Sequence, residues 1–160
     1  MAYSIVGTTH LAAASAGLLF GAEQLIRTRR DALHRRLGYV FVAAMAISNV
    51  TALTIYKFTG GFNVFHALAL YNIFGIIMAL RPMLKKPWPL RWRSMHYQWM
   101  AWSYAGLCAA AATEFLARMV HMEGWLSAAA GTTPVMIVAG LLIPRFAPAQ
   151  RPVQQTVDLP

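Results

Sequence analysis

Five histidines are the residues of this sequence best suited to chemistry, because an imidazole can carry a proton or bind a metal ion near neutral pH. They lie close to the ends of long apolar stretches, at His10, His34, His66, His96 and His121. Ionisable side chains at such places are costly in a membrane and are functional candidates by default. What they can do depends on which of them the folded chain brings together.

The composition is that of a membrane protein. Of the 160 residues, 58% are hydrophobic and only 12% are charged, whereas ordinary soluble domains have about 25% charged residues. A formal net charge of +9 resembles that of a nucleic-acid binder, but most basic residues gather in two stretches, 27–36 and 81–93. The preference of Lys and Arg for cytoplasmic loops produces this pattern. We therefore expect a lipid bilayer, and no nucleic acid, as the surroundings of this chain.

Five stretches are long and apolar enough to cross about 30 Å of hydrocarbon as helices. They cover residues 4–26, 37–56, 62–80, 95–117 and 126–143. The sequence thus predicts an all-α integral membrane protein, with a transmembrane domain over residues 1–143 and a flexible cytoplasmic tail over 144–160. Since both basic stretches follow odd-numbered spans, the N-terminus is expected outside and the C-terminus inside a bacterial inner membrane. Prolines in the stretch from Pro82 to Trp92 predict a non-helical linker there.

The first four spans are expected to form an up-and-down bundle, in which the first and third helices, and the second and fourth, lie diagonally opposite. His34 and His96 then form a pair at the cytoplasmic level, and His10 and His66 form a pair at the outer level. A b-type haem is flat and takes axial histidines from opposite sides. The pattern predicts two bis-histidine haems and transmembrane electron transfer, with a quinone as a possible redox partner.

Haem propionates would need cations near the membrane surfaces. Arg35 and Arg93 stand near the inner histidine pair in the sequence, and Lys57 and Arg118 stand near the outer pair. On the first span, the face of His10 also holds small residues such as Gly17 and Gly21. This face predicts either a groove for the porphyrin edge or close contact between helices.

Two strings carry a resemblance to known families. LHRRLGYV at residues 33–40 and HYQWMAWSYA at residues 96–105 resemble the signatures of an uncharacterised bacterial membrane family, catalogued as domain of unknown function 2306. The similarity covers most of residues 10–120, although Ala101 and Glu114 stand where that family's pattern has basic character. Leu33-His34 followed by Leu37-Gly38 is also similar to the ligand string of diheme b-type transmembrane cytochromes. That resemblance implies diagonal histidine ligands and an ascorbate- or quinol-linked oxidoreductase.

Two other function classes stay open. His10, His66 and His121, with Glu114 as general base, could hold Zn²⁺ in a membrane metallohydrolase. Alternatively, the chain is a non-catalytic subunit of a larger assembly. The fifth span has no ionisable residue and is left over once a four-helix core forms, so it could join copies of the chain, join other subunits, or cover one side of the bundle.

Overall fold

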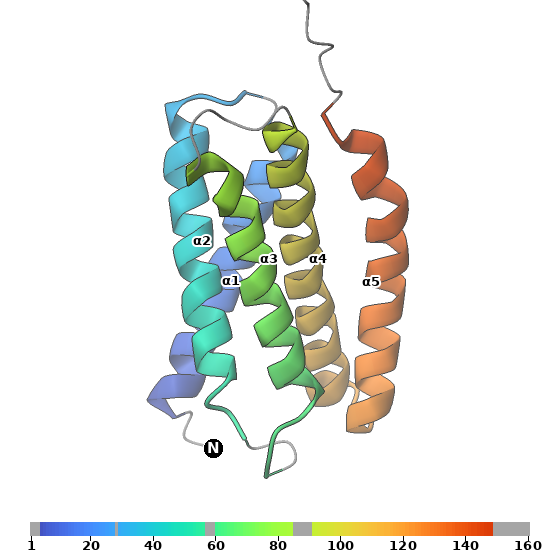
Figure 1. Ribbon diagram of the computed structural model, residues 1–160. Helices are drawn as coiled ribbons and strands as arrows, with labels where there is room; N and C mark the ends of the chain where they lie inside the picture. Colours follow the sequence, from blue (N-terminus) through green and yellow to red (C-terminus); the bar gives the residue numbers. More distant parts are fainter. Residues whose placement is uncertain (1–3, 28, 57–59, 85–90, 149–160) are drawn as a thin grey trace, which may run out of the picture.

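The computed structural model describes residues 4–27, 29–56, 60–84 and 91–148, and these residues form an all-helical structure (Figure 1). The helices are α1 (Ile5–Ile26), α2 (Ala32–Ala52), α3 (Val64–Leu84), α4 (Trp92–Met119) and α5 (Gly124–Phe146). Each predicted span overlaps one helix, although α2 lies four to five residues earlier than the predicted span 37–56. Lys57, residues 85–90 of the predicted linker and the tail from residue 149 lie outside the described residues.

Capping and proline tolerance explain where the helix ends differ from the predicted spans. Asp31 caps α2, because its Oδ1 accepts the backbone N–H of His34 at 3.1 Å, so α2 begins before residue 37. Helix α3 continues through Pro82 to Leu84, and α5 continues through Pro144 to Phe146. Helices among other apolar helices tolerate proline in this way, since neighbouring groups compensate for the missing N–H.

Successive helices run antiparallel, and α1 to α4 form a four-helix bundle (Figure 1). The hairpins α1–α2 and α3–α4 each pack closely, and they meet through lesser contacts of α2 with α3 and of α1 with α4. The diagonal partners are therefore α1 with α3 and α2 with α4. Within the described residues, α5 contacts only α4.

Side chains fill the middle of the bundle. A hydrophobic cluster joins helices α2, α3 and α4, and its buried members are Phe41, Met45, Ile76 and Leu107. A second cluster joins α4 to α5 and consists of Ala101, Ala105, Ala139 and Ile143. In the N-terminal half of α5 the two helices approach closely, since a Cβ built on Gly131 would lie 2.7 Å from the Cα of Thr113.

Within the part of the chain that the structure describes, three helices are long and apolar enough to cross a membrane, namely α1, the segment 65–84 of α3, and α5. Large apolar side chains also cover the outside of the structure, among them Leu19, Ile77 and Leu141. A surface of this kind is typical of contact with lipid rather than water.

Candidate functional site

His34 and His96 lie at the end of the bundle where α1 joins α2 and α3 leads to α4. We call this the basic end and define it by residues 27, 29–36 and 91–97. His34 is in the first turn of α2, and His96 is near the start of α4. Although α2 and α4 are diagonal, the two imidazoles are close enough to interact electrostatically. The structure thus brings together the pair that the sequence predicted for the inner level.

The ring of His96 is held by a helix it does not belong to. Its Nδ1 lies 3.1 Å from the backbone carbonyl oxygen of Ala79 on α3. A carbonyl oxygen only accepts hydrogen bonds, so Nδ1 is the donor, and the neutral ring keeps its lone pair on Nε2. Metal-binding histidines are commonly oriented by a bond of this kind from their other nitrogen.

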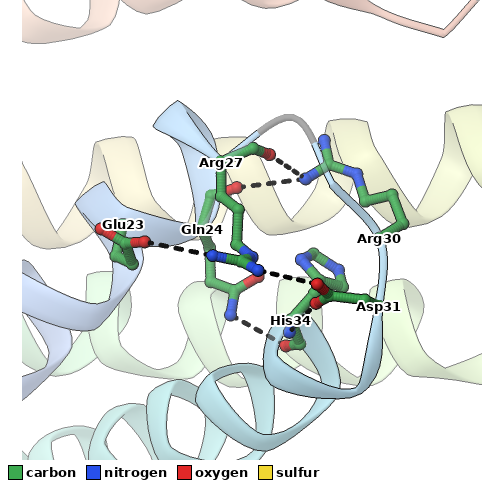
Figure 2. Close-up of polar contacts among 6 residues, drawn as sticks. All are labelled: Glu23, Gln24, Arg27, Arg30, Asp31 and His34. Carbon is green, nitrogen blue, oxygen red and sulfur yellow. Dashed lines mark hydrogen bonds and ion pairs between the residues drawn. The ribbon is translucent and has the colours of Figure 1, made fainter.

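Contacts on both sides fix the backbone of His34 (Figure 2), but Nδ1 of its ring is unpaired. Its N–H donates to Asp31, and its carbonyl oxygen accepts from Nε2 of Gln24 at 2.9 Å. Its Nδ1, by contrast, is buried and has no hydrogen-bond partner. Such an orphaned polar atom is uncommon in folded proteins and calls for an explanation.

The positive charge of Arg30 acts on both members of this histidine pair. Its charge interacts with His34, His96 and the neighbouring Tyr97. Backbone carbonyl oxygens hold its guanidinium, since Nη1 donates to Arg27 at 2.6 Å and to Gln24 at 3.4 Å (Figure 2).

The arginines that sequence spacing suggested as propionate partners are arranged differently. Arg35 is exposed, and the guanidinium of Arg93 lies over the Trp92 ring, 5.5 Å from its centroid. Sequence reasoning missed Arg30, although its place in the short loop between two helices of the bundle was an available signal.

A second set of polar contacts closes the loop between α1 and α2. Nη2 of Arg27 lies 2.8 Å from Oδ2 of Asp31, and Nη1 lies 3.9 Å from Oε1 of Glu23 (Figure 2). The hydrogen bond from the backbone N–H of His34, followed by that from Arg27, lowers the pKa of Asp31 to about 2. Asp31 therefore stays ionised at neutral pH, and its carboxylate links the first turn of α2 to Arg27 at the end of α1.

His10 lies at the opposite end of the bundle, which we call the His66 end and define by His10, Tyr56, His66 and His121. Its Nδ1 lies 3.0 Å from the carbonyl oxygen of Ser48 and 3.0 Å from Oγ1 of Thr51. Because the carbonyl oxygen must accept, the neutral ring keeps its lone pair on Nε2. His10 could therefore act as a ligand.

His66 has the reverse arrangement of hydrogen bonds. Its Nδ1 accepts the backbone N–H of Asn63 at 3.1 Å, so the proton of the neutral ring is on Nε2. That Nε2 is buried and has no partner, and the residue is only 2% exposed. In this arrangement His66 offers a hydrogen-bond donor and no lone pair, so the outer pair does not fit two-sided haem ligation as it stands.

The residues of the zinc hypothesis are dispersed. His121 is exposed, with a left-handed φ of 53°, and Glu114 forms an ion pair with Arg118. Among the residues that the structure describes, no three His, Cys, Asp or Glu side chains gather in a group that could hold a metal ion. His10, His66, His121 and Glu114 thus do not form such a group.

The glycines on the face of His10 serve helix packing. A Cβ on Gly17 would lie 2.9 Å from Cδ2 of Leu107, and one on Gly21 would lie 2.6 Å from Cε2 of Tyr104. The Tyr104 hydroxyl donates to the carbonyl oxygen of Leu18 at 3.2 Å. Of the two readings of this face, the geometry favours close helix contact over a porphyrin groove.

These features define the class: an all-helical membrane protein whose four-helix bundle places histidines at both ends. The chain matches, over residues 7–148, the model of a family described as "Predicted membrane protein (DUF2306)". It belongs to that family, which confirms the resemblance carried by the two strings. No curated protein and no solved structure matches the chain.

Proposed function

We propose that this chain is an electron carrier of the bacterial cytoplasmic membrane that holds one b-type haem at its basic end, between His34 and His96. The observation that carries the proposal is the pairing of these imidazoles across the diagonal of the bundle. One of them is oriented through Nδ1 with its Nε2 lone pair free, and the other has a buried nitrogen without a partner.

Different residues of the basic end would have different roles in binding the haem. His34 and His96 would each hold the haem through an imidazole nitrogen, and the Ala79 carbonyl oxygen would keep the His96 ring in place. Arg30 would neutralise a propionate, because its charge already acts on both histidines. A bound haem would supply one-electron redox chemistry, whose potential depends on axial ligands and nearby charge. The protein itself contributes ligands, orientation and electrostatics.

The proposal keeps one of the two predicted haem sites. At the His66 end, a second haem would require His66 to give up the hydrogen bond from Asn63 and move its proton to Nδ1. His10 needs no such change. The inner site is therefore the one that the arrangement of hydrogen bonds favours.

The proposed setting is a membrane crossed by all five helices, with the N-terminus outside and the basic end in the cytoplasm. The antiparallel order of the helices and the bias of Lys and Arg toward cytoplasmic loops support this orientation (Figure 1). Anionic lipid headgroups would meet the exposed arginines of the basic end, such as Arg35 and Arg36.

The direct test is an absorption spectrum of the detergent-purified protein, oxidised and then reduced with dithionite, with iron and zinc measured on the same sample. We expect a sharp band of low-spin haem on reduction and about one iron per chain. His34→Ala and His96→Ala should each remove the band, and His10→Ala should keep it. A colourless, iron-free protein overturns the proposal, and bound zinc in its place would favour the hydrolase.

A further inference from the structure

The Nε2–H group of His66 is a hydrogen-bond donor buried at the His66 end without an acceptor. The Asn63 N–H occupies Nδ1, which places the proton of the neutral ring on Nε2. A buried donor without a partner loses its hydration and gains no hydrogen bond in return, which is a cost to stability. A ligand that offers an oxygen acceptor would remove this cost.

The surroundings of His66 are aromatic and apolar. The ring of Tyr56 lies 4.9 Å from the imidazole at an interplanar angle of 26°, and that of Phe62 lies 5.2 Å away at 29°. Both rings are also accessible, since Tyr56 is 49% exposed and Phe62 is 66% exposed. The imidazole that carries the donor is thus stacked with two exposed aromatic rings, a surface that a lipophilic, planar molecule could approach.

We propose that the His66 end binds a membrane quinone, with a quinone carbonyl oxygen accepting the hydrogen bond from Nε2–H of His66. A carbonyl oxygen matches a neutral donor, and a planar ring matches the aromatic side chains beside it. An ester carbonyl of a phospholipid offers the same acceptor, but it lacks a planar ring that could lie against Tyr56 and Phe62. The quinone is therefore the better fit.

This inference goes beyond the haem proposal and can succeed or fail without it. The quinone is proposed as a bound ligand at the end of the bundle opposite to His34 and His96. Haem absorbance and quinone binding are separate measurements, so a haem-free protein that binds quinone would support this inference alone. A haem protein that does not bind quinone would support only the haem proposal.

The test uses the full chain in detergent and short-chain ubiquinone and menaquinone analogues with ¹³C-labelled carbonyls. Equilibrium dialysis gives the affinity, and infrared spectroscopy gives the C=O stretching frequency. We expect saturable binding and a lowered frequency, as a hydrogen-bonded carbonyl shows. His66→Phe keeps an aromatic ring but removes the donor, so it should weaken binding about tenfold or more and restore the free frequency.

Two further variants separate the hydrogen bond from general damage. His66→Gln carries an amide N–H that can reach the position of Nε2–H, so it should retain most of the affinity and the lowered frequency. His10→Asn is the matched control at the same end, because its amide can still donate to Ser48 while the free Nε2 is removed. It should bind quinone as the unmodified protein does.

Four results would overturn the proposal. They are no saturable quinone binding by the unmodified protein, a bound carbonyl at its free frequency, full affinity in His66→Phe, and equal losses in His66→Phe and His10→Asn. If His66→Phe fails to fold, the infrared shift of the unmodified protein and the His66→Gln variant still decide the question.

Discussion

Nδ1 of His96 on α4 donates a hydrogen bond to the backbone carbonyl oxygen of Ala79 on α3, over 3.1 Å. Because the acceptor belongs to the neighbouring helix, the direction of the imidazole depends on how α3 and α4 pack. The bond leaves the Nε2 lone pair of His96 available, and His96 interacts electrostatically with His34 on α2. A single tertiary contact thus determines which nitrogen of His96 can act as a ligand.

This contact predicts different effects for two substitutions of His96. The amide of His96→Asn can replace Nδ1–H as donor to Ala79, whereas His96→Ala removes the donor. We expect His96→Ala to lower the free energy of unfolding by about 1–2 kcal/mol and His96→Asn to lower it by less. Both should lose the haem band, since neither has an Nε2. Thermal melts of the haem-free proteins check the first part, and equal stability of the two variants would contradict it.

The charge of Arg30 predicts a shift in reduction potential. A positive charge nearby favours the reduced, less positive haem, so Arg30→Gln should lower the potential. Because Arg30 is exposed and water screens its charge, its contribution is that of a surface ion pair, about 0.2–1 kcal/mol, which corresponds to a fall of roughly 10–40 mV. Arg29→Gln is the control in the same loop, because the charges that act on His34 and His96 include Arg30 and not Arg29. Redox titration of the α-band measures both, and equal shifts would refute a specific role for Arg30.

Asp31 predicts a pH dependence of the first turn of α2. Its pKa falls from an ordinary value of 3.8 to about 2 in the folded protein. The contribution of the carboxylate to stability is therefore present above pH 4 and is lost as the pH falls toward 2. The melting temperature of Asp31→Asn, followed by circular dichroism, should fall less between pH 5 and pH 2 than that of the unmodified protein. Parallel curves for the two proteins would show that Asp31 does not contribute.

The packing of α5 against α4 predicts contrasting effects for two glycines on one helix. A Cβ on Gly131 would lie 2.5 Å from the backbone nitrogen of Thr113, whereas one on Gly140 would lie 3.9 Å from Cη2 of Trp102. Backbone atoms of a helix cannot shift to make room for an added methyl group as easily as the end of a side chain can. Gly131→Ala should therefore destabilise the protein by about 2 kcal/mol or more, and Gly140→Ala should be nearly neutral. Unfolding in detergent measures both, and similar stabilities would mean that α5 does not dock as described.

Cysteine labelling checks the proposed orientation. In a Cys108→Ala background, a cysteine at Gly61 should react with an impermeant maleimide added outside intact cells. A cysteine at Arg29, in the loop of the basic end, should react only after the cells are permeabilised. The reverse pattern would place the basic end outside.

Hydropathy and segment length predicted the helices and the end of the bundle at which each histidine lies. They could do so because both are properties of short stretches of sequence. A stretch such as residues 4–26 is apolar over a membrane's width, and the matching helix α1 runs over Ile5–Ile26. The errors occurred where helix ends depend on specific contacts or context. The side chain of Asp31 starts α2 earlier than hydropathy suggests, and α3 tolerates Pro82. Both features depend on hydrogen bonds and packing that hydropathy does not report.

By itself, the sequence determined that this is an all-helical membrane protein of one family, with histidines at two levels, because helix length, hydropathy and short strings are properties of the chain. Only the tertiary structure decided the state of each imidazole. His96 is oriented by Ala79, His10 by Ser48, and His66 by Asn63 in the opposite sense. The same residue type becomes a potential ligand or a hydrogen-bond donor according to the group placed opposite its Nδ1. The packing of the helices and loops determines which group pairs with Nδ1, so the spacing of histidines along the sequence could not reveal it.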